Sequence, residues 1–270
     1  MNCPTEPSLA GNRAVVTGST SGIGRAIAEE LAAAGATVIV HGSKKREAAV
    51  ALVDSIQAGG GEAEFLLCDL AQSSCCDKLV EQAWQTAPVD TWINNAGVDV
   101  LTGEAADWPF EQKLNALWEV DVMATIRLSR AMGARMKQRG SGTIVNIGWD
   151  QAELGMEGDS GEMFAACKGA VMAFTRSLAK SLAPEVRVNC VAPGWIKTDW
   201  GESASDYWQK RALGESLLNR WGTPQDVARI VRFLVSSQAS FLTGQMIHVN
   251  GGRKGTGVVP LNRPESGWNL

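Results

Sequence analysis

Short apolar segments alternate along the chain with longer segments in which apolar residues recur every three or four positions. The short segments are almost wholly apolar, as strands of a parallel sheet are when helices cover both faces. The longer segments have the period of amphipathic helices. This alternation predicts a single α/β domain with a doubly wound parallel sheet of about seven strands. The strands are expected at residues 13–17, 37–41, 62–67, 90–93, 143–147, 186–190 and 246–249.

The same pattern predicts the helices and divides the chain into a domain, a lid and a tail. Residues 194–221 interrupt the alternation and are rich in tryptophan, which indicates a mobile lid inserted over the carboxyl edge of the sheet. The domain is expected to span residues 1–252, followed by a tail with glycine and proline at 253–270. Helices are expected at residues 23–34, 44–58, 73–86, 114–139 and 163–183, and from Thr223, where threonine can cap and Pro224 fits the first turn.

Charge and cysteine content exclude several classes of protein. The net charge of the 270 residues is −4, so nothing indicates binding to nucleic acid or to an anionic membrane. The first ten residues hold no secretory pattern, and no apolar run approaches the ~20 residues of a membrane-spanning helix. The six cysteines form no CxxC pair and are accompanied by only two histidines, so no metal site is expected. Reduced cysteines in a cytoplasmic protein are the expectation.

A glycine-rich turn follows the first predicted strand and opens the first helix. Such a turn lets the backbone approach a pyrophosphate and points a helix N-terminus at its negative charge. The glycine spacing here is GxxxGxG rather than the GxGxxG of the standard fingerprint. The turn nevertheless meets the physical requirements for binding a pyrophosphate. A tight turn without a ligand is the structural alternative. The turn reads Thr17-Gly18-Ser19-Thr20-Ser21-Gly22-Ile23-Gly24.

Three further motifs follow this turn in order and extend the pattern over almost the whole chain. With them, residues 11–252 resemble the short-chain dehydrogenase/reductase family. The resemblance implies a Rossmann-type fold, a nicotinamide dinucleotide cofactor and oxidoreduction of a small molecule. The motifs are Asn94-Asn95-Ala96-Gly97, Pro193-Gly194-Trp195-Ile196-Lys197-Thr198 and Asn250-Gly251-Gly252, with Asp69 after the third strand.

The resemblance also implies a role for individual residues in holding the cofactor. Asp69 would meet the adenine; the structural alternative is that it caps the helix that starts near Ser73, and both roles can hold at once. Asn95 would lie beside the adenosine ribose, and Lys168 would bind the ribose of the nicotinamide. The pyrophosphate would be surrounded by Gly18, Ser21, Gly22, Ile23 and Gly24, and the carboxamide held by Pro193, Ile196 and Thr198.

The end of the second predicted strand bears on the choice of cofactor. An acidic residue there binds the ribose 2′-hydroxyl of NAD. This chain instead has His41-Gly42-Ser43-Lys44-Lys45-Arg46, with three bases and no acid. A 2′-phosphate would be attracted near Ser43 and Lys44, which favours NADP(H) over NAD(H). The alternative is that the three bases are only the solvated start of a helix.

The catalytic half of the family pattern is altered. The family carries Tyr-x-x-x-Lys, in which the tyrosine moves the proton of the substrate oxygen and the lysine lowers the tyrosine pKa. Here Phe164 precedes Lys168 at that spacing, and the sole tyrosine is Tyr207. The family's serine would be replaced by Trp149 or Gln151, depending on how the preceding loop is aligned, and its asparagine by Asp121. Of the four positions, only Lys168 matches.

Two catalytic interpretations follow from the missing proton relay. In the first, hydride passes to a substrate that needs no strong proton donor, such as an iminium ion, drawn by carboxylates and aromatic faces. The segment 150–162 would supply the carboxylates Asp150, Glu153, Glu157, Asp159 and Glu162, unless these form only a solvated loop. In the second, a relocated acid serves redox or non-redox chemistry, with Asp150, Asp121, Glu153, Cys167 and Tyr207 as candidates.

A third interpretation is a non-catalytic protein that binds the nucleotide as a sensor or as a partner subunit. The family's subunits pair through two long helices, here expected at residues 114–139 and 163–183, into homodimers or homotetramers. Such pairing needs an apolar stripe and would survive the loss of catalysis. The stripe would consist of Leu114, Leu117, Val120 and Ala124.

Overall fold

The computed structural model describes residues 8–254 and confirms the predicted fold class, a single-domain Rossmann-type α/β fold. One sheet of seven strands runs in the order β3-β2-β1-β4-β5-β6-β7, and every neighbouring pair is parallel. The strands are β1 (Arg13–Val16), β2 (Thr37–Gly42), β3 (Glu62–Leu67), β4 (Thr91–Asn94), β5 (Gly142–Ile147), β6 (Val186–Pro193) and β7 (Met246–Val249).

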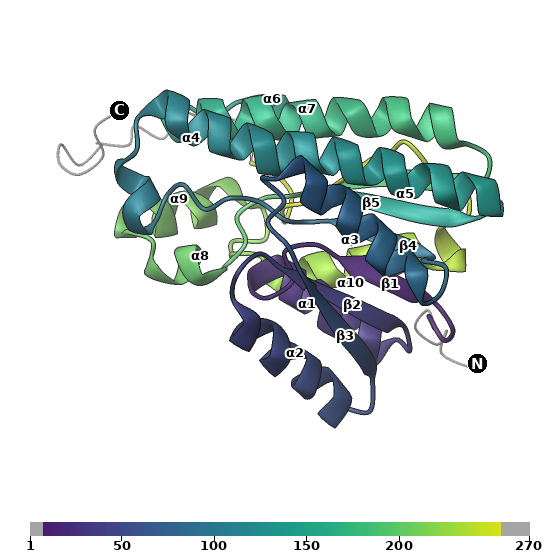
Figure 1. Ribbon diagram of the computed structural model, residues 1–270. Helices are drawn as coiled ribbons and strands as arrows, with labels where there is room; N and C mark the ends of the chain where they lie inside the picture. The colour runs from purple at the N-terminus through teal and green to yellow at the C-terminus, as the bar shows by residue number, and fades with distance from the viewer. Residues whose placement is uncertain (1–7, 255–270) are drawn as a thin grey trace, which may run out of the picture.

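Helices cover both faces of the sheet (Figure 1). Helices α1, α2 and α10 pack on one face around buried Ile27, Leu52 and Val231, and α3, α5 and α7 pack on the other around Leu79 and Met132. Burial on both faces explains why the strands are almost wholly apolar. The bounds are α1 (Gly22–Ala33), α2 (Arg46–Ala58), α3 (Ser73–Gln85), α4 (Phe110–Leu117), α5 (Thr125–Arg139), α6 (Gln151–Leu154), α7 (Asp159–Leu182), α8 (Asp199–Ser203), α9 (Asp206–Glu215) and α10 (Pro224–Val235), with 3-10 turns η1 (Gly103–Asp107) and η3 (Ser237–Ala239).

The helix expected at residues 114–139 is interrupted in the structure. Helices α4 and α5 are joined by the π-helical segment η2 (Trp118–Ala124), which contains Asp121. A π-helical turn is rare, shifts the side chains of one helical turn, and is frequent at functional sites. This shift is what a regular helical period in the sequence does not predict.

The segment 150–162 is also more ordered than the loop that its acidic residues suggested. It contains α6, and α7 begins at Asp159, four residues before the expected start at 163. Gly158 precedes α7 with a φ of 85°, a conformation that favours glycine. Asp159 and Glu162 lie in the first turn of α7, where acidic side chains are favourable.

Two residues of the apolar stripe expected to pair two subunits are buried within the chain. Leu117 is fully buried beside Cys167 and Met163 of α7, and Ala124 is buried against the α3–α5 side of the sheet. Leu114 and Val120 are only partly buried, so subunit pairing through this stripe stays a prediction.

The tryptophan-rich segment 194–221 folds over the carboxyl edge of the sheet and contains α8 and α9. Its end is tied to the chain beyond β7: Leu217 and Leu218 donate backbone hydrogen bonds to Gly252 and Gly251. The Lys254 N–H donates to the carbonyl of Glu215. Residues 253 and 254 thus contact the lid, and residues 255–270 of the expected tail lie outside the described residues.

Candidate active site

A cleft of about 770 Å³ opens at the carboxyl edge of the sheet, where the strand order reverses between β1 and β4. Ligands of doubly wound folds bind at such a point, and the volume suits a small molecule together with a cofactor. Lys44 and Asp150 do not line this cleft. The other residues predicted for the site do: Gly18, Ser21, Gly22, Ile23, Gly24, Ser43, Asp69, Asn95, Asp121, Phe164, Lys168, Pro193, Ile196 and Thr198.

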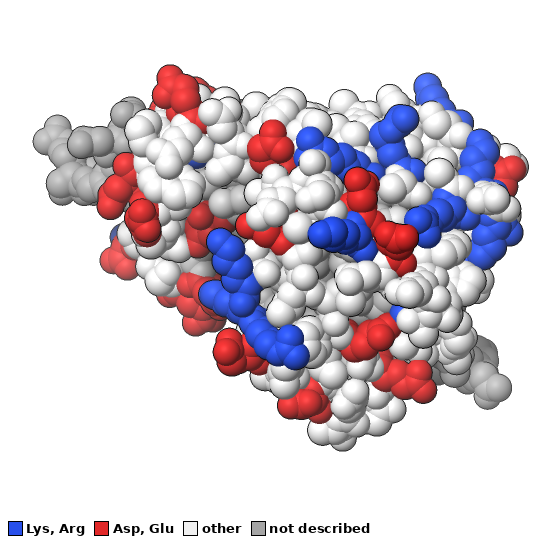
Figure 2. Space-filling model, viewed as in Figure 1, with Lys and Arg blue, Asp and Glu red and all other residues white. Residues whose placement is uncertain are grey.

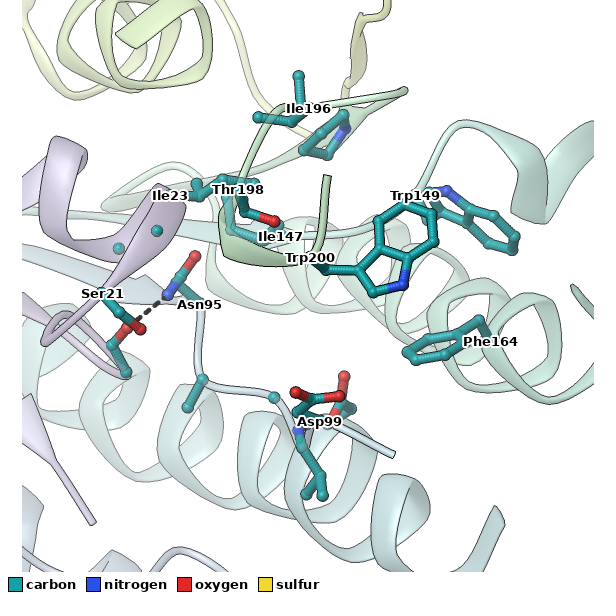
Figure 3. A pocket seen from close by; sticks show the side chains of 18 of the residues that line it. Ser21, Ile23, Asn95, Asp99, Ile147, Trp149, Phe164, Ile196, Thr198 and Trp200 are labelled. Carbon is teal, nitrogen blue, oxygen red and sulfur yellow. Dashed lines mark hydrogen bonds between the residues drawn. The ribbon is translucent and has the colours of Figure 1, made fainter. Parts of the chain in front are cut away.

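The glycine-rich turn needs glycine for steric reasons. Gly18 has a φ of +61°, and a Cβ on it would lie 2.7 Å from the Cα of Ala96. A Cβ on Gly24 would lie 2.3 Å from the carbonyl oxygen of Gly18. The side-chain amide of Asn95 donates to the carbonyls of Thr17 and Gly18, at 3.1 and 3.0 Å, and holds the turn against β4. Figure 3 shows one hydrogen bond of this amide as a dashed line.

The N-terminus of α1 has the properties of an anion site. The helix is 12 residues long and carries no acidic side chain in its first turn. Its free N–H groups and dipole favour a negative charge there. Together with the close-packed glycines, this arrangement fits a pyrophosphate.

Asp69 lines the cleft after β3 and does not cap α3. The N-cap residue of α3 is Gln72, and the Asp69 carboxylate instead accepts a hydrogen bond from the N–H of Ala71, at 3.2 Å. The helix-cap alternative for Asp69 is therefore wrong, because the helix begins too far along the chain for its side chain to cap it.

His41, at the end of β2, is a site residue whose role the sequence pattern did not predict. It is 2% exposed, and its Nδ1 accepts a hydrogen bond from the N–H of Gly18 at 3.1 Å. The proton is therefore on Nε2, which lies 3.1 Å from the carbonyl oxygen of Cys68 and donates to it. The imidazole thus joins the glycine-rich turn to the end of β3. Burial lowers the pKa of His41 to about 4.

The lowered pKa of His41 predicts a pH-dependent stability. Between about pH 6.5 and pH 4, His41 is protonated in the unfolded chain but remains neutral in the folded protein. We expect this group to reduce the free energy of unfolding by about 1.4 kcal/mol per pH unit as the pH falls through that window. Urea unfolding at several pH values measures it. His41→Gln should flatten the curve and His248→Gln, on β7, should not; equal slopes in all three proteins would contradict the prediction.

Basic side chains gather beside the outer end of the cleft. Ser43 lines the cleft, and Lys44, Lys45 and Arg46 are exposed around the start of α2, where Figure 2 shows a run of basic side chains. The helix begins at Arg46 rather than at residue 44, so Lys44 lies in the loop that connects β2 to α2. No acidic residue occurs in this stretch.

At the inner end of the cleft, Lys168 is neutralised by a carboxylate. Its Nζ lies 2.8 Å from Oδ2 of Asp121, and the two side chains are 13% and 2% exposed. Oδ1 of Asp121 also accepts the N–H of Val98, at 3.0 Å. The π-helical segment thus presents Asp121 to α7. The lysine cation has a fixed partner and is not free to act on a neighbouring group.

Aromatic rings occupy the space next to this ion pair. Phe164 lies one helical turn before Lys168, and its ring meets that of Trp149 edge to face, with centroids 6.2 Å apart (Figure 3). Of the two candidates for the serine position, only Trp149 lines the cleft. Gln151 is buried and donates to Glu215, at 3.3 Å.

The carboxylates of the segment 150–162 do not line the cleft. Asp150 is 5% exposed and accepts a hydrogen bond from Asn250, and burial raises its pKa. Glu153 pairs with Arg176, at 2.8 Å, and Glu157 with Arg211, at 2.6 Å. These carboxylates are engaged away from the cleft, so the expected role of this segment in attracting a substrate was wrong.

Two other candidates for a relocated acid are placed away from the reacting region. Cys167 is fully buried, and burial raises the pKa of its thiol to about 11, opposite to what a reactive thiolate needs. Tyr207 does not line the cleft, and its hydroxyl accepts a hydrogen bond from Arg211, at 3.2 Å. Asp121 is the one of these candidates that the fold brings into the cleft.

The sequence analysis missed several lining residues, among them Asp99, Met156 and Ser160. Ser160 could have been found, because it lies four residues before Phe164 and so on the same side of α7. No comparable sequence spacing indicates that Asp99 lies in the cleft. Its carboxylate accepts the N–H groups of Leu101 and Thr102 in a turn.

The comparisons with known proteins agree with this architecture. Residues 18–254 match the family model described as enoyl-(acyl carrier protein) reductase. The 3-oxoacyl-[acyl-carrier-protein] reductase FabG of Aquifex aeolicus is 36% identical over 254 residues, which cover 92% of this chain and 99% of the relative. The chain belongs to the short-chain dehydrogenase/reductase family.

Solved structures of this family resemble the chain over almost its full length. A 3-oxoacyl (acyl-carrier-protein) reductase from Agrobacterium tumefaciens with NADP bound is 32% identical, with a TM-score of 0.82 over 91% of this chain and 95% of that chain. A 7α-hydroxysteroid dehydrogenase complexed with NADH and 7-oxo glycochenodeoxycholic acid is also 32% identical, with a TM-score of 0.83 and the same two coverages.

Among residues 8–254, no helix is long and apolar enough to cross a membrane. The same part of the chain brings no three His, Cys, Asp or Glu side chains together as a metal site, and Cys68, Cys75, Cys76, Cys167 and Cys190 are free thiols.

Proposed function

We propose that this protein is an NADP(H)-dependent oxidoreductase that transfers hydride without the serine–tyrosine relay of its family. Its substrate would need no strong proton donor, as an iminium ion does not. One observation carries this: the ring of Phe164 stands one turn from Lys168, whose cation is neutralised by Asp121 at 2.8 Å. A phenyl ring has no proton to give, and Trp149 adds none.

The substrate class follows from the proton balance. When bound, the cofactor supplies a hydride, which carries both electrons of its bond. An iminium carbon accepts this hydride while the C=N π electrons become the nitrogen lone pair, so no proton is consumed. A ketone would become an alkoxide and would need a donor at its oxygen. The residues beside Lys168 would then position the substrate and exclude water.

The residues that line the outer and central parts of the cleft would bind the cofactor. The N-terminus of α1, with Gly18, Ser21 to Gly24 and Asn95, would hold the pyrophosphate and its ribose, and Asp69 the adenine. Lys168 and the segment from Pro193 to Thr198 would hold the nicotinamide end. Exposed bases beside Ser43, with no acid between residues 41 and 46, support NADP(H) over NAD(H), and Lys44 would reach the 2′-phosphate from the loop.

The alternative is a nucleotide-binding protein without catalytic activity. A neutralised Lys168 supports it too, because the proton relay of the family could not then operate. We further propose that the protein is a cytoplasmic homodimer or homotetramer. Trp118 on η2 and Phe241 after η3 are large apolar side chains left 39% and 101% exposed, and they support contact with another subunit.

Cofactor titration followed by a matched pair of substrates tests the proposal. We expect NADPH to quench tryptophan fluorescence at lower concentration than NADH. We then expect the protein to oxidise NADPH with N-methyl-1-pyrrolinium, a permanent cation, and not with cyclopentanone, a ketone of similar size.

Each other outcome has a distinct meaning. Absence of quenching by both nucleotides would refute the cofactor assignment. Equal consumption of ketone and iminium would show that a proton donor is present and refute the proposed mechanism. Tight NADPH binding that changes hydrogen exchange in the lid, without turnover of either compound, would favour the non-catalytic alternative.

A further inference from the structure

The lid and the inner end of the cleft together form an aromatic chamber, defined here by Trp149, Phe164, Trp195, Trp200 and Trp208. We propose that this chamber binds a planar aromatic group that carries a positive charge, such as an N-alkylated aromatic heterocycle. The inference names the substrate class of the site and rests on the function proposed above.

The rings surround one space from two sides of the cleft. Trp149 and Phe164 form the wall contributed by the β5 and α7 side. In the lid, the Trp195 and Trp200 rings are stacked, with centroids 6.3 Å apart and an interplanar angle of 19°, and Trp208 lies 5.6 Å from Trp195. Figure 3 shows Trp149, Phe164 and Trp200 at the same end of the cleft. Flat walls of this kind favour a flat ligand, which can stack on one ring and meet another edge on.

The charges that line the cleft favour a cation. Apart from His41 at the opposite end, Lys168 is the one basic side chain among the described residues of the lining, and Asp121 neutralises it. Three further carboxylates line the cleft, Asp69 after β3 and Asp99 and Asp199. An anionic group in the chamber would find no free cation, whereas a cation would meet aromatic faces and carboxylates.

Arg211 holds the lid rings from behind. It is 8% exposed, and its guanidinium lies 5.4 Å from the Trp208 ring and 6.0 Å from the Trp195 ring. It pairs with Glu157 and with Glu215, and Glu215 also accepts the indole N–H of Trp195, at 2.8 Å. This network joins α9 to the segment before α7 and fixes the rings before a ligand arrives. Arg211 does not line the cleft and is therefore a positioning residue.

Binding of three ring compounds tests this without requiring turnover. The probes are 1-methylquinolinium (cation), quinoline at pH 8 (neutral) and 2-naphthoate (anion), titrated calorimetrically into the full chain with saturating NADP. We expect the cation to bind about tenfold more tightly than the neutral ring, and the anion to bind most weakly. Trp208→Leu should weaken binding of the cation about tenfold. Trp84→Leu, on α3 and outside the cleft, should leave it unchanged.

Arg211→Lys separates positioning from charge, because it keeps the cation and loses the planar fork. We expect weaker binding of 1-methylquinolinium with an unchanged dissociation constant for NADP. Trp200→Phe, which keeps a ring, should retain most of the affinity and guards against a folding defect in Trp208→Leu.

Equal affinity for the cation and the anion, or a folded Trp208→Leu variant with wild-type affinity, would overturn this proposal. The two proposals fail separately. Selective binding without hydride transfer to any iminium leaves the chamber intact and refutes the enzyme function. Turnover of N-methyl-1-pyrrolinium without any preference for aromatic cations would support the enzyme function and refute the aromatic chamber as a cation site.

Discussion

Ketone reduction is expected to rise by about 10²–10⁴-fold when Phe164→Tyr, Trp149→Ser and Asp121→Asn are combined, because a positioned general acid contributes that factor. The phenol would stand one turn before Lys168 on α7, and the asparagine would no longer cancel the lysine charge. A free cation close to a tyrosine lowers the tyrosine pKa and so favours proton exchange. The measurement is NADPH oxidation with cyclopentanone under saturating cofactor.

The single variant is the informative control. Phe164→Tyr alone is expected to change ketone reduction less than tenfold, because Asp121 still neutralises Lys168 and Trp149 brings no hydroxyl. Phe174→Tyr makes the same chemical change on α7 outside the cleft and should have no effect. Full ketone reductase activity from Phe164→Tyr alone would mean that the site has merely lost one hydroxyl and that Asp121 does not restrain Lys168.

Breaking the Lys168–Asp121 ion pair is expected to destabilise the fold strongly. Asp121→Leu leaves the Lys168 ammonium without its partner, and Lys168→Met leaves the Asp121 carboxylate, which is 2% exposed, without its own. Removal of one member of a buried pair costs about 3–5 kcal/mol. For a domain of this size, that corresponds to a fall in melting temperature on the order of 10 °C.

The double variant tests whether the loss of stability in each single variant comes from the interaction between Asp121 and Lys168. Replacing both members with apolar residues removes the two uncompensated charges, so Asp121→Leu with Lys168→Met should be more stable than the sum of the single variants by at least about 1 kcal/mol. The free energies come from urea unfolding of the four proteins. Additive effects would show that the two side chains do not interact in solution. They would therefore refute the explanation that Asp121 neutralises Lys168.

The nucleotide half of the cleft could be predicted from the sequence because its requirements are local. Gly18 and Gly24 must be glycine, since any Cβ would collide with Ala96 or with the backbone of the turn itself. The turn lies at a strand–helix junction that the apolar pattern locates. Asn95 lies directly after β4, which pairs with β1, so its position near the turn follows from the strand order of a doubly wound sheet.

The substrate half was predicted less well, because its chemistry depends on which distant side chains meet. Five acids close together in sequence suggested an acidic site, yet Asp150 is buried behind the cleft and Glu157 is taken up by Arg211. Sequence spacing gave two candidates, Trp149 and Gln151, for one position. Only the path of the chain after β5 places Trp149 in the cleft and turns Gln151 toward Glu215.

By itself, the sequence determined the fold class, the dinucleotide turn and the absence of a tyrosine four residues before Lys168. These depend on apolar periodicity, on steric limits at glycine and on residue identity, all of which are local. The tertiary structure alone decided that Lys168 is neutralised by Asp121 and that the lid tryptophans are held by Arg211. The first pairing joins η2 to α7, and Arg211 is itself held by Glu157, 54 positions earlier in the chain. The first depends on a π-helical turn whose shift of side chains leaves no mark in the hydrophobic pattern.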